Sequence, residues 1–208
     1  MKIIALGQQK GGVGKSSSAI MLACQAVALE EKTAILDMDT EQATALKWFN
    51  KRKSGSPHVE VCEAGRLDEH LSQLRNEGYA WVFLDLPGRS APAANAGLVA
   101  SDLILIPCRP VDTDIEPSGA TVQSALRAGR KYSYLMNISP PHRERARAKQ
   151  VQAALRAAGH PVADTIIVQS VGIQDAMASG GGINERSPGS TSDQEYAELF
   201  AWIKETVK

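Results

Sequence analysis

The sequence predicts an α/β fold in which helices cover both faces of a doubly wound, mostly parallel sheet. Short apolar segments rich in β-branched residues alternate along the chain with segments of helical pattern. Some of them, such as residues 103–106 (Leu-Ile-Leu-Ile), are apolar on both faces, as a strand between two helical layers requires. The 208 residues contain no internal repeat and no linker, so we expect one well-buried domain over residues 1–208.

The apolar segments define seven strands in chain order. They are predicted at residues 2–7, 33–37, 59–63, 81–85, 103–107, 133–138 and 165–168. Helical periodicity is found between them at residues 16–29, 41–53, 66–77, 117–129 and 144–158. Residues 54–57 (Ser-Gly-Ser-Pro) are predicted to form a turn or short loop.

The C-terminal segment combines a glycine-rich stretch with a final helix. Glycines at 180–182 and the sequence Ser-Pro-Gly-Ser at 187–190 predict a flexible surface stretch. A helix is expected from residue 192 to 208, capped by Ser192, because Glu195 follows at the spacing of a capping box. Its apolar stripe consists of Leu199, Phe200, Trp202 and Ile203, and its polar face carries Asp193, Glu195, Glu198 and Glu205. This acidic face would be repelled by anionic lipid, so we expect a helix docked on the domain and no membrane partner.

The composition limits the classes of function. The 23 basic and 23 acidic residues balance, so affinity for nucleic acid has to come from local clusters. The three cysteines, Cys24, Cys62 and Cys108, lack the spacing of a metal site and are expected to be free thiols in a reducing cytosol. We expect no secretory signal, because the chain leads directly into a strand. No apolar segment approaches the roughly 20 residues of a membrane-spanning helix, so the predicted location is cytoplasmic.

Residues 10–16 read Lys-Gly-Gly-Val-Gly-Lys-Ser and directly follow the first strand, which is the pattern of a phosphate-binding loop. Glycines let several backbone N–H groups point inward at one anion, and the next helix directs its positive end at the same place. Lys15 can reach the β- and γ-phosphates, and the Ser16 hydroxyl can ligate Mg²⁺. The cradle is predicted to consist of Gly11, Gly12, Val13, Gly14, Lys15 and Ser16. A plain strand–helix turn would explain neither lysine, and Lys10 is not needed for the cradle.

Three aspartates follow the second and fourth predicted strands. Because the carboxyl ends of parallel strands meet at the ligand crevice, Asp37, Asp39 and Asp85 are expected near the phosphates. Asp85, in a segment of Walker B form, suits a Mg²⁺ site through bound water, with Ser16 and Asp37 as the other predicted metal residues. Asp39 is our choice for orienting the attacking water. Capping of the next helix is the alternative for Asp37 and Asp39.

Three motifs together resemble the ParA/MinD family of deviant Walker A ATPases, specifically small ParA-type plasmid or chromosome partition ATPases. They are Lys10-Gly-Gly-Val-Gly-Lys15-Ser16, Asp37-Met-Asp39 and Asp85-Leu-Pro-Gly-Arg89. The resemblance spans nearly the whole chain and implies a P-loop NTPase fold of the deviant Walker A type, the cofactors ATP and Mg²⁺, and slow hydrolysis. It also implies a homodimer that sandwiches two ATP molecules, in which Lys10 crosses to the other subunit's phosphates. Lys10, Lys15 and Asp39 are then the predicted catalytic residues.

The resemblance extends to two further nucleotide contacts and has two departures. Asn137 matches a residue that hydrogen-bonds adenine, although a turn-forming asparagine is an equal alternative. Ser17 matches the position that contacts the α-phosphate. The family's Asp-Pro-Gln is replaced by Asp39-Thr-Glu-Gln42, so Gln42 takes the place of the glutamine in our interpretation. The commoner double proline after Asp85 is replaced by Leu-Pro-Gly.

Basic residues gather between positions 127 and 149, where seven face one acidic residue. They are Arg127, Arg130, Lys131, Arg143, Arg145, Arg147 and Lys149. Such a cluster can follow DNA phosphates without reading bases, although charge runs are also typical of solvated helix faces. In small ParA-like proteins the ATP-bound dimer binds DNA non-specifically.

The sequence therefore predicts a partition ATPase that associates with the nucleoid and is stimulated by a ParB-like partner. The first alternative is the same ATPase positioning a protein complex or other cargo. A P-loop ligase of the dethiobiotin-synthetase kind is a rival that Lys10 argues against. A module that binds ATP without turnover is a rival that Asp39 argues against.

Overall fold

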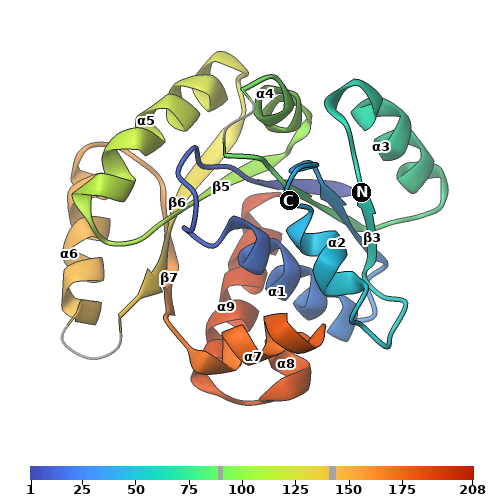
Figure 1. Cartoon of the computed structure of the whole chain (residues 1–208). Helices are drawn as coiled ribbons and strands as arrows, with labels where there is room; N and C mark the ends of the chain where they lie inside the picture. The colour runs from blue at the N-terminus through green and yellow to red at the C-terminus, as the bar shows by residue number, and fades with distance from the viewer. Residues whose placement is uncertain (89–90, 141–143) are drawn as a thin grey trace.

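Seven parallel strands form one sheet in the order β3-β2-β4-β1-β5-β6-β7 in the computed structural model (Figure 1). The structure describes residues 1–88, 91–140 and 144–208. The strands are β1 (Lys2–Leu6), β2 (Thr33–Asp37), β3 (His58–Val61), β4 (Trp81–Asp85), β5 (Leu103–Cys108), β6 (Lys131–Ser139) and β7 (Val162–Val168). The predicted doubly wound, parallel α/β sheet is confirmed.

Helices cover both faces of this sheet. They are α1 (Lys15–Ala28), α2 (Thr44–Phe49), α3 (Leu67–Asn76), α4 (Ala91–Ala100), α5 (Asp112–Arg127), α6 (Glu144–Ala157), α7 (Val171–Ser179), α8 (Ile183–Arg186) and α9 (Thr191–Thr206). A short 3₁₀ turn (Ala64–Arg66) precedes α3. One core lies between the sheet and α1, α2, α7, α8 and α9, and a second lies between the sheet and α3 to α6.

The two cores explain why the strands are apolar on both faces. In β1, Ile4 and Leu6 pack into the core beneath α1 and α9. Their neighbours Ile3 and Ala5 pack into the core beneath α3, α4 and α5. Successive side chains of a strand point to opposite faces, so each face of β1 needs its own apolar residues.

Helix α5 begins five residues earlier than its predicted start at Pro117. The proline lies inside the helix and has no N–H to donate to the carbonyl of Thr113. That carbonyl accepts a hydrogen bond from Lys10 Nζ at 2.9 Å instead. The interior proline is therefore accommodated by a side chain from the phosphate-binding loop.

The prediction of a flexible surface stretch is wrong for the glycines at 180–182, which are buried. A Cβ at Gly180 would lie 2.6 Å from the backbone N of Arg52, and one at Gly182 would lie 2.6 Å from Cys24 Cβ. Trp48 Nε1 donates to the carbonyl of Gly181 at 3.1 Å. Glycine is required here because α1 and the segment after α2 approach the backbone closely, not because the segment moves.

The final helix begins at Thr191, so the predicted cap at Ser192 is wrong. Ser190 is the N-cap, and its hydroxyl accepts the N–H of Asp193 at 3.3 Å. Glu195 does not lie on the polar face. It is buried, and its carboxylate accepts the N–H of Val168 at 3.0 Å. Among the helices that the structure describes, none has the length and apolar character to cross a bilayer.

Candidate nucleotide site

The phosphate-binding loop begins where three neighbouring strands end at the same level. Asp85, the last residue of β4, is in register with Leu6 of β1 on one side and with Asp37 of β2 on the other. Adjacent strands lie about 4.8 Å apart, so the start of the loop and both carboxylates are brought together. The predicted convergence of these residues at the carboxyl edge of the sheet is thus realised in the structure.

The loop itself depends on two glycines with left-handed backbone conformation. Gly12 has a φ of 75° and Gly14 a φ of 87°, a region that residues with a Cβ rarely adopt. A Cβ at Gly14 would also lie 2.3 Å from the Asn137 amide nitrogen. Gly14 is the N-cap of α1, and its carbonyl accepts the Ser17 hydroxyl at 3.1 Å.

A cavity of about 830 Å³ opens above this loop. Its wall is formed by the loop and α1, the segment after β2, and the residues after β4. It includes Gly11, Gly12, Gly14, Lys15, Ser16, Ser17, Asp39, Glu41, Gln42, Pro87 and Gly88. This volume is in the range of small-molecule sites, and most residues of the predicted cradle line it.

Asp85 is buried beside the loop, and neither of its carboxylate oxygens has a hydrogen-bond partner among the residues that the structure describes. Burial raises its pKa to about 7; Asp37 and Asp39 add to the rise, and nearby Ser16 and Lys15 oppose it. A buried carboxylate left without donors is costly unless it neutralises or meets a cation. These orphaned oxygens fit a bound Mg²⁺ ion with its water ligands.

Asp37 has a different environment, although it is equally buried. One oxygen accepts the N–H groups of Ala45 at 2.8 Å and Leu46 at 3.2 Å, and the other accepts that of Asp39 at 3.2 Å. Burial raises the pKa of Asp37, whereas these three N–H donors lower it. Asp37 therefore caps the first turn of α2, which is the alternative that the sequence left open for it.

Lys15 lies close to two of the carboxylates. Burial lowers the pKa of its ammonium group, while Asp85 and Asp39 raise it. Its Nζ lies 3.4 Å from the carbonyl oxygen of Lys10. The ammonium group is thus held inside the cradle, where a phosphate would replace lost hydration.

Lys10 points away from the cradle and is bound by helix α5. Its Nζ lies 2.6 Å from the Asp114 carboxylate and donates to the carbonyl of Thr113. Asp114 is fully buried, and its two carboxylate oxygens also accept hydrogen bonds from the Arg109 guanidinium group at 2.8 and 3.0 Å. Burial alone would raise the pKa of Asp114, but the bonds from Arg109 and Lys10 outweigh burial and lower it to about 2.

Asp114 and Arg109 were missed in the sequence. The available signal was the pair Asp112 and Asp114 directly after the fifth predicted strand. Asp114 is separated from Lys10 by 104 positions, so only the topology brings them together. The structure thus shows Lys10 engaged within its own subunit, and its predicted action on a second subunit stays a prediction.

Asn137 is buried at the end of β6, behind the loop rather than in the cavity. Its amide nitrogen donates to the carbonyl of Val13 at 2.8 Å and to the Ser18 hydroxyl at 3.3 Å. The predicted adenine contact remains untested, but both observed bonds serve the loop and α1.

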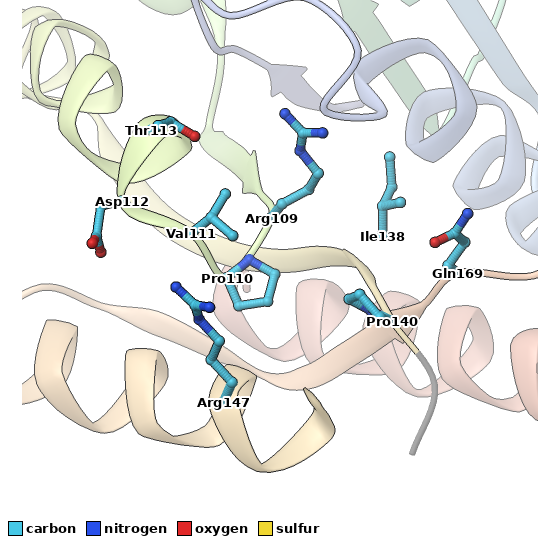
Figure 2. Close-up of a pocket in the computed structure, with 9 residues that line it drawn as sticks. All are labelled: Arg109, Pro110, Val111, Asp112, Thr113, Ile138, Pro140, Arg147 and Gln169. Carbon is cyan, nitrogen blue, oxygen red and sulfur yellow. The ribbon is translucent and has the colours of Figure 1, made fainter. Parts of the chain in front are cut away.

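The basic residues fall into two groups at opposite ends of β6. Arg127, Arg130 and Lys131 lie at its amino end, while Arg145, Arg147 and Lys149 lie on α6, beyond its carboxyl end. Nine strand residues separate the groups by roughly 30 Å. Arg143 lies outside the described residues. Figure 2 shows Arg147 extending from α6 toward the loop of Pro110, along a second cavity of about 610 Å³.

Two of these cations have partners within the chain. Arg145 lies 3.1 Å from the buried carboxylate of Glu195, and Lys131 Nζ donates to the carbonyl of Thr206 at 2.9 Å. The Arg145 side chain is still 48% exposed, so its guanidinium group can also meet an anion from solvent.

Comparisons with known proteins cover the region of the loop and most of the chain. A family model described as AAA domain matches residues 1–63. The maintenance of carboxysome distribution protein A of Gloeobacter kilaueensis is 29% identical over 170 residues, covering 80% of this chain and 76% of that protein. The chromosome-partitioning ATPase Soj of Thermus thermophilus is 26% identical over an alignment of 242 positions, covering 99% of this chain and 96% of that protein.

The fold has a solved counterpart. The septum site-determining protein MinD of Pyrococcus horikoshii, complexed with Mg-ADP, matches with a TM-score of 0.79 and 15% identity, over 98% of this chain and 96% of that chain. This likeness supports the arrangement of strands and helices. The family model, the sequence relatives and the loop with two lysines support assignment of the chain to the ParA/MinD family of deviant Walker A ATPases.

Proposed function

We propose that this protein is a Mg²⁺-dependent, ParA-like partition ATPase. Two copies close around two ATP molecules, bind DNA without sequence specificity, and segregate plasmid or chromosomal DNA. A ParB-like partner stimulates hydrolysis and releases the dimer. The observation that carries the proposal is the buried Asp85 carboxylate, which has no partner within the described part of the chain and lies beside a loop that presents Lys15 and Ser16.

The residues of the loop and the three aspartates each have a role in this proposal. The loop N–H groups and Lys15 bind the phosphates, and Ser16 with Asp85 holds Mg²⁺ and its water ligands. Asp37 does not contact the ligand in this proposal; it accepts backbone N–H groups and so fixes the segment that carries Asp39. Bound Mg²⁺ supplies positive charge for the phosphate oxygens. Asp39, on the cavity wall, orients the attacking water, so catalysis consists mainly of positioning and charge neutralisation.

Lys10 is the residue that links ATP to dimerisation. In the single chain it is held by Asp114 and Thr113. In the dimer it leaves them and binds the phosphates of the other subunit, where a cation stabilises the charge that develops during hydrolysis. Arg109 keeps Asp114 paired after Lys10 has left, because it contacts both carboxylate oxygens. The buried carboxylate therefore never loses its counter-charge.

Binding to random-sequence duplex DNA tests the DNA part of the proposal. It is measured with ATP, with ADP and without nucleotide, each at two salt concentrations. Strong binding with ATP alone that weakens steeply with salt is the expected result, because phosphate contacts release counterions. Equal, weak binding in all three nucleotide states would exclude DNA as the partner.

A second candidate function keeps the ATP switch and changes the cargo. The relative in Gloeobacter kilaueensis is named for maintaining carboxysome distribution. By analogy, this chain would position a protein complex on nucleoid DNA. Purification of proteins retained by the ATP-bound form separates the two: a DNA-bound ParB-like protein supports partition, and a component of a protein assembly supports the second candidate.

A further inference from the structure

Gln8, the second residue after β1, is a buried amide that contacts three different parts of the fold. Its side-chain oxygen accepts the N–H of Gln9 at 2.8 Å, just before the phosphate-binding loop. Its nitrogen donates to the carbonyl of Asp114 at 3.1 Å, in the first turn of α5, and to the Cys108 sulfur at 3.2 Å, at the end of β5. Gln8 is only 2% exposed. Both ends of this amide are therefore used to tie the start of the loop to α5.

The first turn of α5 is weakly held by the helix itself. Val111, its N-cap residue, has no side-chain oxygen that could accept an N–H group of this turn. Pro117 has no N–H to donate to the carbonyl of Thr113. The position of the turn therefore depends on contacts from outside the helix, and the start of the loop supplies two of them, through Gln8 and Lys10.

Gln8 and Lys10 bind neighbouring acceptors of the same turn. Lys10 Nζ lies 2.6 Å from the Asp114 carboxylate and 2.9 Å from the carbonyl of Thr113. Gln8 holds the main-chain carbonyl of Asp114. Because Gln8 fixes the turn against the loop, Lys10 finds its acceptors in place, and less conformational entropy is lost when it binds them. The two contacts are therefore expected to strengthen each other.

We propose that Gln8 is a positioning residue that acts through Lys10. By docking the first turn of α5 on the loop, it stabilises the position in which Lys10 is held by its own subunit. Lys10 cannot contact Asp114 and the phosphates of the other subunit at the same time, so Gln8 raises the ATP concentration at which two chains associate. This inference rests on the proposed role of Lys10 and adds a regulation of the same site.

Dimerisation of Gln8→Met is the first test. Methionine fills nearly the same space, but it cannot donate to Asp114 and is a weak acceptor for the Gln9 N–H. The hydroxyls of Ser118 and Tyr134, 2.9 Å apart, still hold α5 on the sheet. Light scattering at a fixed protein concentration gives the concentration of a non-hydrolysable ATP analogue, with Mg²⁺, at which half of the protein is dimeric.

This half-dimer concentration is expected to be about threefold to tenfold lower for Gln8→Met than for the wild type, which corresponds to the loss of one buried hydrogen bond. Affinity for MgADP, measured by calorimetry, is expected to stay unchanged, because Gln8 lies outside the cradle.

A double-mutant cycle tests the link to Lys10 without nucleotide. Urea unfolding gives the free energy of unfolding of the wild type, Gln8→Met, Lys10→Ala and the double variant. Lys10→Ala is expected to destabilise the Gln8→Met background less than the wild type, because the acceptors of Lys10 are no longer held in place there.

Gln152→Met is the matched control, since Gln152 is also a buried amide. It lies on α6, and its nitrogen donates to the carbonyls of Ala163 at 2.8 Å and Asp164 at 3.2 Å. Its loss is expected to destabilise the protein, to add to the effect of Lys10→Ala, and to leave the half-dimer concentration unchanged.

The outcomes are distinct. An unchanged or higher half-dimer concentration in a folded Gln8→Met would overturn the inference, and so would additive effects of Gln8→Met and Lys10→Ala. A fall in MgADP affinity that accounts for the change would overturn it as well, because it would assign Gln8 to the cradle. If Gln8→Met does not fold, Gln8→Asn, with a shorter amide, is judged by the same criteria. A wild type that does not dimerise with the analogue would refute the proposed function, and the cycle without nucleotide would still decide whether Gln8 positions Lys10.

Discussion

Asp85 is a carboxylate whose charge depends on what occupies the site. It is buried, its oxygens have no partner in residues 1–88, 91–140 and 144–208, and burial raises its pKa to about 7. The ionised form needs a cation, and Lys15 alone only partly offsets the cost of burial. Binding of Mg²⁺ with ATP is therefore expected to release a proton from this residue near neutral pH.

The stability of the nucleotide-free protein tests this account of Asp85. Its folded-state pKa of about 7 exceeds the ordinary value of 3.8, so between these pH values the folded chain holds a proton that the unfolded chain has lost. Stability contributed by this group then falls as the pH rises from about 4 to about 7. Asp85→Asn is expected to stabilise the protein at pH 8 by on the order of 2–4 kcal/mol and to weaken Mg²⁺-dependent nucleotide binding.

Urea unfolding at pH 5 and pH 8 measures the effect. Asp68→Asn, which changes an exposed carboxylate on α3, is the control and is expected to leave the pH dependence as in the wild type. An Asp85→Asn variant with the same pH dependence as the wild type would contradict the assigned role.

At the scale of elements, α5 shows how a local irregularity serves the site. Pro117 leaves the carbonyl of Thr113 without a helical donor, and Lys10 supplies one. Pro117→Ala adds an N–H that competes for this carbonyl. The variant is expected to be more stable by about 1–3 kcal/mol, because an interior proline costs about that much in a helix.

Pro92→Ala is the matched control for this change. Pro92 lies in the first turn of α4, where no hydrogen bond is lost, so the substitution is expected to change stability little. Unfolding in urea compares the two variants with the wild type. A Pro117→Ala variant that is less stable than the wild type would show that the helix does not carry the expected strain.

The same scale explains what the sequence could predict. Strands 33–37 and 81–85 were predicted to the residue, because their apolar runs end sharply at Asp37 and Asp85. The start of α2 was placed three residues early, because its first turn is capped by Asp37 from the end of the preceding strand. Non-local contacts also decide the burial of Gly180 against Arg52. Such contacts leave no periodic signal.

In the site, the glycine loop and the three aspartates could be predicted because each has a local motif. The contact of Lys10 with Asp114 and the hydrogen bond from Asn137 to Val13 could not be predicted, because each joins positions more than a hundred residues apart in the sequence. Strand β6 divides the basic segment into two groups. Lys131 is its first residue, and Arg145 lies beyond its carboxyl end. A run of charge along the sequence is therefore not a continuous surface.

At the scale of the whole molecule, this division makes the DNA proposal specific. Arg147 and Lys149 lie in the first two turns of α6, which follows the carboxyl end of β6. The double variant Arg147→Ala and Lys149→Ala is expected to weaken ATP-dependent DNA binding at all sequences. Two lost phosphate contacts lower the slope of log affinity against log salt by about 2.

The control for this double variant removes the same charge elsewhere. Lys53→Ala with Arg75→Ala changes two exposed cations at the other side of the sheet and is expected to leave the salt dependence unaltered. Salt titrations of binding to random-sequence DNA measure both. An equal loss in the two double variants would mean that net charge, and not the α6 group, determines binding.

The central claim is that ATP controls the association of two chains through Lys10. Light scattering of the wild type, Lys10→Ala and Lys15→Ala, each with Mg²⁺ and a non-hydrolysable ATP analogue, tests it most directly. The wild type is expected to double its mass of 22.3 kDa, Lys10→Ala to bind the analogue and stay monomeric, and Lys15→Ala to lose binding itself. A nucleotide-bound Lys10→Ala that dimerises as the wild type does would contradict the account.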